Sequence, residues 1–258
     1  MSSQVINSYS FASALEPMDD TDLKCYWRFN EASGNIINQS VSSESLGSSA
    51  NLVMTGGTYE TGSPPTTASG GNGILFDGVD DFGQVSSLSM WNFMHNTSCL
   101  YTVAWWMKTV AINGGCHIFS TTMTEGTTIG HMFRYELPND HMFFISTRGT
   151  DYTRVYVRKT SANYVPDFTN WYFYVATADI SAEPMFNVSR NNANVESASL
   201  ADPANDSNST YNGTVSRRPD ASAGFGNQYL SEMSIWNRVL TADEITSLYN
   251  GGAGRSIY

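Results

Sequence analysis

The chain has 258 residues, a length that a single β-sandwich domain ordinarily reaches, and no linker divides it. Lysine and arginine number 13 against 24 aspartate and glutamate residues, which gives a formal net charge of −11. Because an acidic surface repels phosphate, the composition argues against nucleic acid and anionic membranes as partners. The same acidity suits solubility, a cationic partner or a bound divalent metal.

Apolar residues make up 41% of the chain and aromatic residues 13%, enough for a sizeable core. The three cysteines, Cys25, Cys99 and Cys116, match no zinc-binding spacing. We expect all three to be reduced and buried; one disulfide with one free thiol is the alternative. No segment has the apolar length of a membrane span, and the polar start of the chain predicts no secretory leader.

The first segment, Met1–Asp22, has weak periodicity and is predicted to form an N-terminal arm, with one domain over residues 23–258. Lys24–Asn30 alternates and is rich in aromatic residues, as a strand is. Tyr229–Trp236 is the last predicted strand. A strand near each end of the chain suggests a sandwich that is closed by pairing its two termini.

The middle of the chain carries short strand signals separated by turn residues. Gly73–Phe76 and Phe82–Val85 flank Asp77–Asp81, which resembles a hairpin turn. Leu100–Lys108 is the clearest strand, because its residues alternate between two faces. Further strands are predicted at Cys116–Ser120, His131–Tyr135, Met142–Thr147, Arg154–Arg158, Trp171–Ala178 and Met185–Arg190.

Two stretches rich in small polar residues, Ser40–Gly73 and Asn191–Gly224, are long for loops in a compact domain. Such segments are either functional or partly structured.

One helix is predicted near the end of the chain. Thr241 and Glu244 have the spacing of a capping box, in which each side chain satisfies a free backbone amide at the helix start. Ile245 and Leu248 then share one face, and Asn250–Gly252 ends the helix. We expect this helix to lie against the sandwich.

Five segments resemble, in the right order, the landmarks of laminin-G-like domains in the concanavalin-A-like lectin/glucanase superfamily. They are Tyr26–Gly34, Leu75–Phe82, Tyr101–Lys108, Asn170–Ala176 and Ser231–Gly252. The resemblance implies an all-β fold, a two-sheet antiparallel jelly-roll sandwich with one short C-terminal helix. Members include lectins, pentraxin-like proteins, adhesion modules, glycoside hydrolases and virion proteins, so the fold does not fix the function.

Many relatives bind calcium through oxygen ligands near the sheet edge, so the resemblance implies a calcium site. The candidate carboxylates are Glu31, Asp77, Asp80, Asp81 and Glu232. Asn30 and Ser231 stand where the family frequently has aspartate, and each change removes a charge that calcium favours. The alternative is that the three aspartates only form a turn by accepting bonds from backbone amides.

Catalytic patterns are missing from the sequence. The superfamily's glucanases carry Glu-x-Asp-x-x-Glu on one strand, and this chain has no such spacing. No Gly-x-Ser-x-Gly motif presents a serine nucleophile. His117, His131 and His141 lie on or beside predicted strands without ligand spacing, and we expect them to be packing or surface residues. We therefore expect a protein that is not an enzyme.

Trp105 and Trp106 are consecutive on a predicted strand and point to opposite faces. One of them must leave the inter-sheet core, and an exposed indole would mark contact with a glycan or a protein partner. Tyr211 is a third candidate for such contact. The alternative is that a loop or other segment covers the outward ring.

These observations favour a non-enzymatic structural or assembly protein. The three lysines, the terminal arm and the missing leader suggest a virion protein that decorates a capsid or associates with a fibre, located at the virion surface. Its partners would be further copies of the chain or capsid proteins. The alternative is a glycan-binding lectin or adhesion module, with or without calcium. A carbohydrate hydrolase or lyase has no supporting motif.

Overall fold

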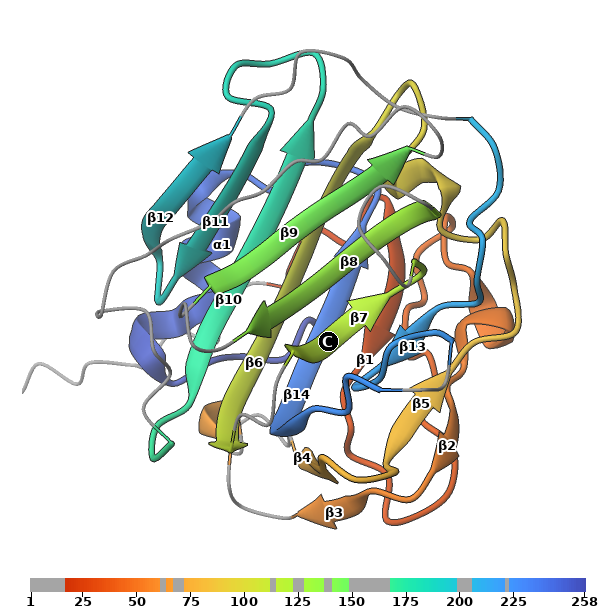
Figure 1. Ribbon diagram of the computed structural model, residues 1–258. Helices are drawn as coiled ribbons and strands as arrows, with labels where there is room; N and C mark the ends of the chain where they lie inside the picture. The colour runs from red at the N-terminus through yellow and green to blue at the C-terminus, as the bar shows by residue number, and fades with distance from the viewer. Residues whose placement is uncertain are drawn as a thin grey trace, which may run out of the picture.

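The computed structural model describes residues 17–60, 64–66, 72–111, 115–122, 128–136, 141–148, 168–198, 206–220 and 223–258. Two antiparallel sheets face each other, with one short helix near the C-terminus (Figure 1). This confirms the predicted all-β sandwich. The predicted strand at Arg154–Arg158 lies outside the described residues.

Within the described residues, the larger sheet has eight strands. Seven follow one path, in the order β12 (Ala193–Ala198), β11 (Phe186–Arg190), β10 (Tyr172–Asp179), β6 (Leu100–Ala111), β14 (Asn227–Trp236), β4 (Gly73–Asp77) and β3 (Thr58–Glu60). The eighth, β1 (Leu23–Trp27), pairs with the second half of β14, where Trp27 lies opposite Met233. The predicted pairing of the two ends of the chain is therefore confirmed.

The smaller sheet, as far as the structure describes it, has six strands in the order β2 (Val53–Thr55), β5 (Phe82–Gln84), β13 (Thr214–Val215), β7 (Gly115–Ser120), β8 (Ile129–Glu136) and β9 (His141–Arg148). The predicted hairpin around Asp77–Asp81 is wrong, because β4 and β5 lie in different sheets. β4 finds its partners in β3 and β14, whereas β5 pairs with β2 and β13. The turn therefore joins the two layers at the edge of the sandwich.

Strand β6 shows how the sequence builds the core. Its inward side chains, all buried between the sheets, are Tyr101, Val103, Trp105 and Met107. Ala104 and Trp106 face the other side, where they belong to a second apolar cluster with Leu248 of helix α1 (Ala242–Tyr249). The predicted alternation and the predicted packing of the helix are both confirmed. Each large apolar side chain buried in this way stabilises the fold by about 1.5–3 kcal/mol.

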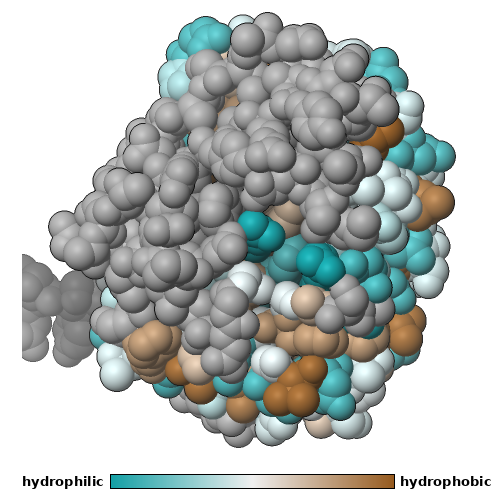
Figure 2. Space-filling view, in the orientation of Figure 1, coloured by the Kyte–Doolittle hydropathy of each residue, from teal (hydrophilic) through white to brown (hydrophobic). Residues whose placement is uncertain are grey.

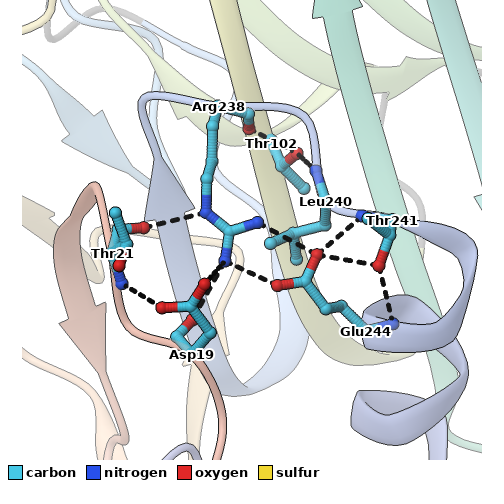
Figure 3. Close-up of polar contacts among 7 residues, drawn as sticks. All are labelled: Asp19, Thr21, Thr102, Arg238, Leu240, Thr241 and Glu244. Atoms are coloured by element: carbon cyan, nitrogen blue, oxygen red, sulfur yellow. Dashed lines mark hydrogen bonds and ion pairs between the residues drawn. The ribbon is translucent and has the colours of Figure 1, made fainter.

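Arg238 links the helix to the last residues of the predicted arm (Figure 3). Its guanidinium donates to both carboxylate oxygens of Glu244, at 2.9 and 2.6 Å, and to the carbonyl oxygen of Thr21 at 2.8 Å. Thr241 accepts a bond from the Glu244 amide, and the Glu244 carboxylate accepts one from the Thr241 amide, which confirms the capping box. Residues 17–22 of the predicted arm thus contact the domain, and residues 1–16 lie outside the described residues.

All three cysteines are buried and free, as predicted. No helix in the described part of the chain combines the length and the hydrophobicity that crossing a bilayer requires.

Candidate functional site

The two tryptophans of β6 are both covered. Trp105 stacks on Tyr174 with ring centroids 5.6 Å apart, inside the core. Trp106 lies 5.3 Å from Phe173 and 6.2 Å from Tyr249 of α1. Their exposed fractions are 1% and 2%, so the expected contact with a glycan or partner through these indoles does not fit this structure. The helix covers the outward ring, which was the alternative.

Tyr211 is half-buried, on the connection that leads into β13. Its backbone amide donates to the carbonyl of Thr121 at 3.3 Å. Its contact with a glycan or partner stays a prediction.

Three of the five predicted metal ligands lie together. The carboxylate groups of Asp77, Asp80 and Asp81 each offer an oxygen within 4.8 Å of the others, and no second group of this kind occurs among the described residues. Asp77 Oδ1 accepts a bond from the Val79 amide at 2.8 Å, and Asp81 Oδ2 accepts one from the Asp77 amide at 3.0 Å. The aspartates thus stabilise the turn between the sheets.

The fit of this turn to calcium is partial. Calcium takes about six to eight oxygens, and three carboxylates supply only part of that number. Asp81 is buried, and its Oδ1 lies so close to Gly56 that a Cβ on that glycine would sit 1.7 Å from it. Asp77 and Asp80 are exposed. Calcium binding stays a prediction, and three of its five candidate ligands lie together at this turn.

The other two predicted ligands lie elsewhere. Glu31 Oε1 accepts a bond from the Ile37 amide at 2.9 Å. Glu232 lies on β14 and is only 5% exposed. Neither belongs to the aspartate group.

Glu232 occupies an irregular point of β14. Ser231 lies opposite Trp106 and Ser234 opposite Ala104, so β14 has one extra residue here, and Glu232 has a left-handed φ of 50°. Such bulges re-aim a side chain. No sequence signal marks this bulge, because the left-handed conformation usually calls for glycine and the residue here is a glutamate.

The bulge directs the Glu232 carboxylate toward the two ends of the chain. It accepts hydrogen bonds from the hydroxyl of Tyr26 and from Arg28 Nε, the latter at 3.3 Å. Burial raises the pKa of Glu232 to about 7, although the positive charge of Arg28 opposes the rise. The Tyr26 hydroxyl also contacts Ser256 Oγ at 3.0 Å and accepts a bond from the Ile257 amide at 3.2 Å.

The cavity beside Glu232 has a volume of about 10 Å³ and is lined partly by Tyr26, Trp106 and Arg255. That space holds about one water molecule. The Tyr26 hydroxyl thus links the Glu232 carboxylate to the C-terminal residues, and the cavity leaves no room for a substrate beside the carboxylate.

The histidines whose side chains are described are packing residues, as expected. His117 is buried beside Arg134. Burial is the main cause that lowers the pKa of His117 to about 3, and the positive charge of Arg134 lowers it further. His117 Nδ1 lies 2.7 Å from Ser120 Oγ. Burial also lowers the pKa of His131 well below its ordinary value. Both rings are neutral at pH 7.

Part of the outer face of the smaller sheet, among the residues whose side chains are described, is polar. Figure 2 shows strongly hydrophilic residues over β7 and β13 at the centre of this view. Arg218, just after β13, donates to both carboxylate oxygens of Asp220, at 2.7 and 2.8 Å. The charges of this pair compensate each other.

An open groove of about 630 Å³ lies beside the edge of the smaller sheet. One wall comes from the one-turn helix η1 (Gly47–Ala50) and β2, and the other from the segment that follows β5. The lining residues are Leu46, Ser48, Ser49, Asn51, Val53, Ser86, Ser87 and Met90. We call this hollow the serine groove. In Figure 1, β2 and β5 lie side by side at the lower right.

The serine groove combines hydroxyl groups, one amide and three apolar side chains, and its lining contains no charged residue. Its volume is within the range of about 300–1,000 Å³ that small-molecule sites occupy. The sequence marks Ser40–Gly73 as an irregular stretch, but no pattern in it singles out the groove residues. Serines carry no specific motif, and the two walls are distant in sequence, so only the richness in serine pointed to this region.

Residues 77–246 match the family model described as "Concanavalin A-like lectin/glucanases superfamily". No curated protein matches the sequence. Among solved structures, the chain is similar to the receptor-binding domain of botulinum neurotoxin type G, with 11% identity over 89% of this chain and 51% of that one and a TM-score of 0.55. The binding domain of botulinum neurotoxin DC, described in complex with SialylT, gives 12% identity, 89% and 51% coverage and a TM-score of 0.57.

A sialidase of Trypanosoma rangeli is also similar, with 12% identity over 90% of this chain and 33% of that one and a TM-score of 0.54. The chain thus spans about half the length of the neurotoxin domains and a third of the sialidase. At these identities the likeness shows a shared fold.

Proposed function

Because the chain belongs to the concanavalin A-like lectin/glucanase superfamily, we propose that it is a non-enzymatic, glycan-binding module and that the serine groove is its site. The groove is the observation that carries this proposal. Hydroxyl and amide groups exchange hydrogen bonds with sugar hydroxyls, and apolar side chains pack against the C–H faces of sugar rings. The lining offers both kinds of contact.

Two further observations support a binding role over catalysis. The sequence has no Glu-x-Asp-x-x-Glu motif. Glu232, the buried carboxyl with the raised pKa, lies beside a cavity that holds about one water molecule, which leaves no room for a sugar. The neurotoxin domain described in complex with SialylT has a similar fold, which is consistent with a sugar ligand for this module.

The test is binding of the purified chain to an array of neutral and acidic oligosaccharides. We expect reproducible binding to a related set of glycans, reduced when Ser86→Trp fills the groove. Ser33→Trp is the matched control, because Ser33 is an exposed serine that does not line the groove. A chain that binds no glycan at any concentration tested contradicts the proposal.

An assembly role, in a virion or with other copies of the chain, is the second proposal. It is supported by an exposed apolar pair close to where the predicted arm ends. Val41 is 76% exposed and Tyr258 50% exposed, and the Tyr258 hydroxyl accepts a bond from the Val41 amide and donates one to Asp20. Burial of this pair against another protein surface would remove apolar area from water and so stabilise the contact. Light scattering tests the proposal: a defined oligomer supports it, and a monomer at all concentrations opposes it.

A further inference from the structure

We infer that the serine groove recognises an uncharged saccharide and does so without calcium. This inference rests on the proposed glycan-binding function and goes further by naming the class of sugar. Three features of the groove support it: its charge, its free hydrogen-bonding groups and its apolar contacts.

The charge of the groove disfavours acidic sugars. None of the lining residues carries a charge, and the whole chain has a net charge of −11. The backbone of Lys24 contacts the groove wall, because its carbonyl oxygen accepts the amide of Leu46. The ammonium group of Lys24 is already 2.8 Å from the Glu44 carboxylate. A sugar carboxylate would meet no uncompensated cation in the lining and would be repelled by the acidic body.

The hydrogen-bonding groups of the groove are available. The hydroxyls of Ser48, Ser49 and Ser86 have no hydrogen-bond partner among the described residues, and each can donate one bond and accept two. Asn51 uses Oδ1 to accept the Asn38 amide at 2.8 Å, which leaves its Nδ2 to donate. Ser87 Oγ accepts the Met90 amide at 3.3 Å and keeps its own hydrogen for a ligand. Groups that both donate and accept match the hydroxyls of a neutral sugar.

The apolar contacts are modest. Leu46 and Met90 are partly buried, and Val53 is 55% exposed, so each presents methyl or methylene groups to the groove. The lining has no aromatic ring. Recognition therefore depends mainly on hydrogen bonds, and removing hydroxyl groups should weaken it measurably.

The groove suits a sugar better than an extended peptide. A peptide that adds to a sheet edge gains affinity from a ladder of backbone bonds. The edge strand here, β2, has only three residues and supports a very short ladder.

Calcium has no ligands in the groove. The lining contains no carboxylate, and the aspartates at 77, 80 and 81 are not part of it. Calcium favours several charged oxygens, so binding to this groove should not require the ion.

The test is an array of matched neutral and sialylated oligosaccharides, probed with the chain in calcium and again in chelator. Titration calorimetry then compares the wild-type chain with the Ser48→Ala/Ser86→Ala double variant and with Ser33→Ala as control. We expect binding to neutral glycans that chelator leaves unchanged and that the double variant weakens about tenfold or more, since two hydrogen bonds are lost. Thermal unfolding of each variant verifies that it is folded.

Each of the other outcomes overturns one part of the inference or the proposed function on which it rests. Binding restricted to sialylated glycans overturns the neutral class and leaves the glycan-binding function standing. Loss of glycan binding in chelator overturns the claim that binding does not require calcium. Neutral binding that the double variant does not weaken overturns the groove as the site. Failure to bind any glycan overturns the proposed function itself.

Discussion

Replacing Glu232 by glutamine should change how the stability of this domain depends on pH. The pKa of Glu232 is about 7, against an ordinary value of 4.5, because the carboxyl is buried. The folded chain therefore holds the Glu232 proton more tightly than the unfolded chain. The stability that this protonated carboxyl contributes is fully present below pH 4.5. That stability is lost as the pH rises from 4.5 to about 7, and above about pH 7 Glu232 causes no further change in stability.

The size of the effect follows from the two pKa values. At about 1.36 kcal/mol for each pH unit between them, the difference corresponds to about 3 kcal/mol. Glutamine resembles the neutral carboxyl in shape and cannot ionise. The Glu232→Gln variant should therefore gain about 3 kcal/mol relative to the wild-type chain between pH 4.5 and pH 8.

Urea denaturation of both proteins at several pH values measures this gain. The other titrating groups are common to the two chains, so their contributions cancel in the difference between the curves. A difference that stays constant across this pH range would refute the reasoning, because it would mean that Glu232 titrates at its ordinary pKa.

Three further predictions concern the rest of the domain. Arg238→Ala should destabilise the domain by about 2 kcal/mol in urea denaturation, because the bonds to Glu244 and Thr21 are lost. Arg238→Lys should recover only part of that stability. Equal stability of Arg238→Ala and the wild-type chain would contradict a stabilising role for these bonds. Thr241→Ala should cost about 1 kcal/mol by removing the helix cap, with no change expected at an exposed serine such as Ser33→Ala. The proton resonances of His117 should not titrate between pH 5 and pH 8, because its pKa is about 3; a midpoint near 6.5 would contradict its burial.

The sequence predicted those features that local pattern determines. Alternation in β6 identified its two faces, and the spacing of Thr241 and Glu244 identified the helix cap, because each signal lies within a few residues. The pairing of β1 with β14 followed from the position of strand signals near both ends of the chain.

Features set by distant contacts could not be predicted. The Asp77–Asp81 turn resembles a hairpin locally, but its flanking strands pair with partners elsewhere in the chain and join different sheets. The burial of Trp106 depends on α1, which lies far along the sequence. The serine groove forms only when η1 and the segment after β5 come together, and none of its residues is distinctive alone.

The most direct test of the glycan-binding account is to locate the bound sugar by NMR. Amide shifts of the labelled chain would be followed while a neutral oligosaccharide chosen from the array is added. The account predicts that the largest shifts fall on Ser48, Ser49, Ser86, Ser87 and their neighbours, and that they saturate with added sugar. Shifts confined to the Asp77–Asp81 turn or to Tyr211, with the groove unaffected, would contradict it.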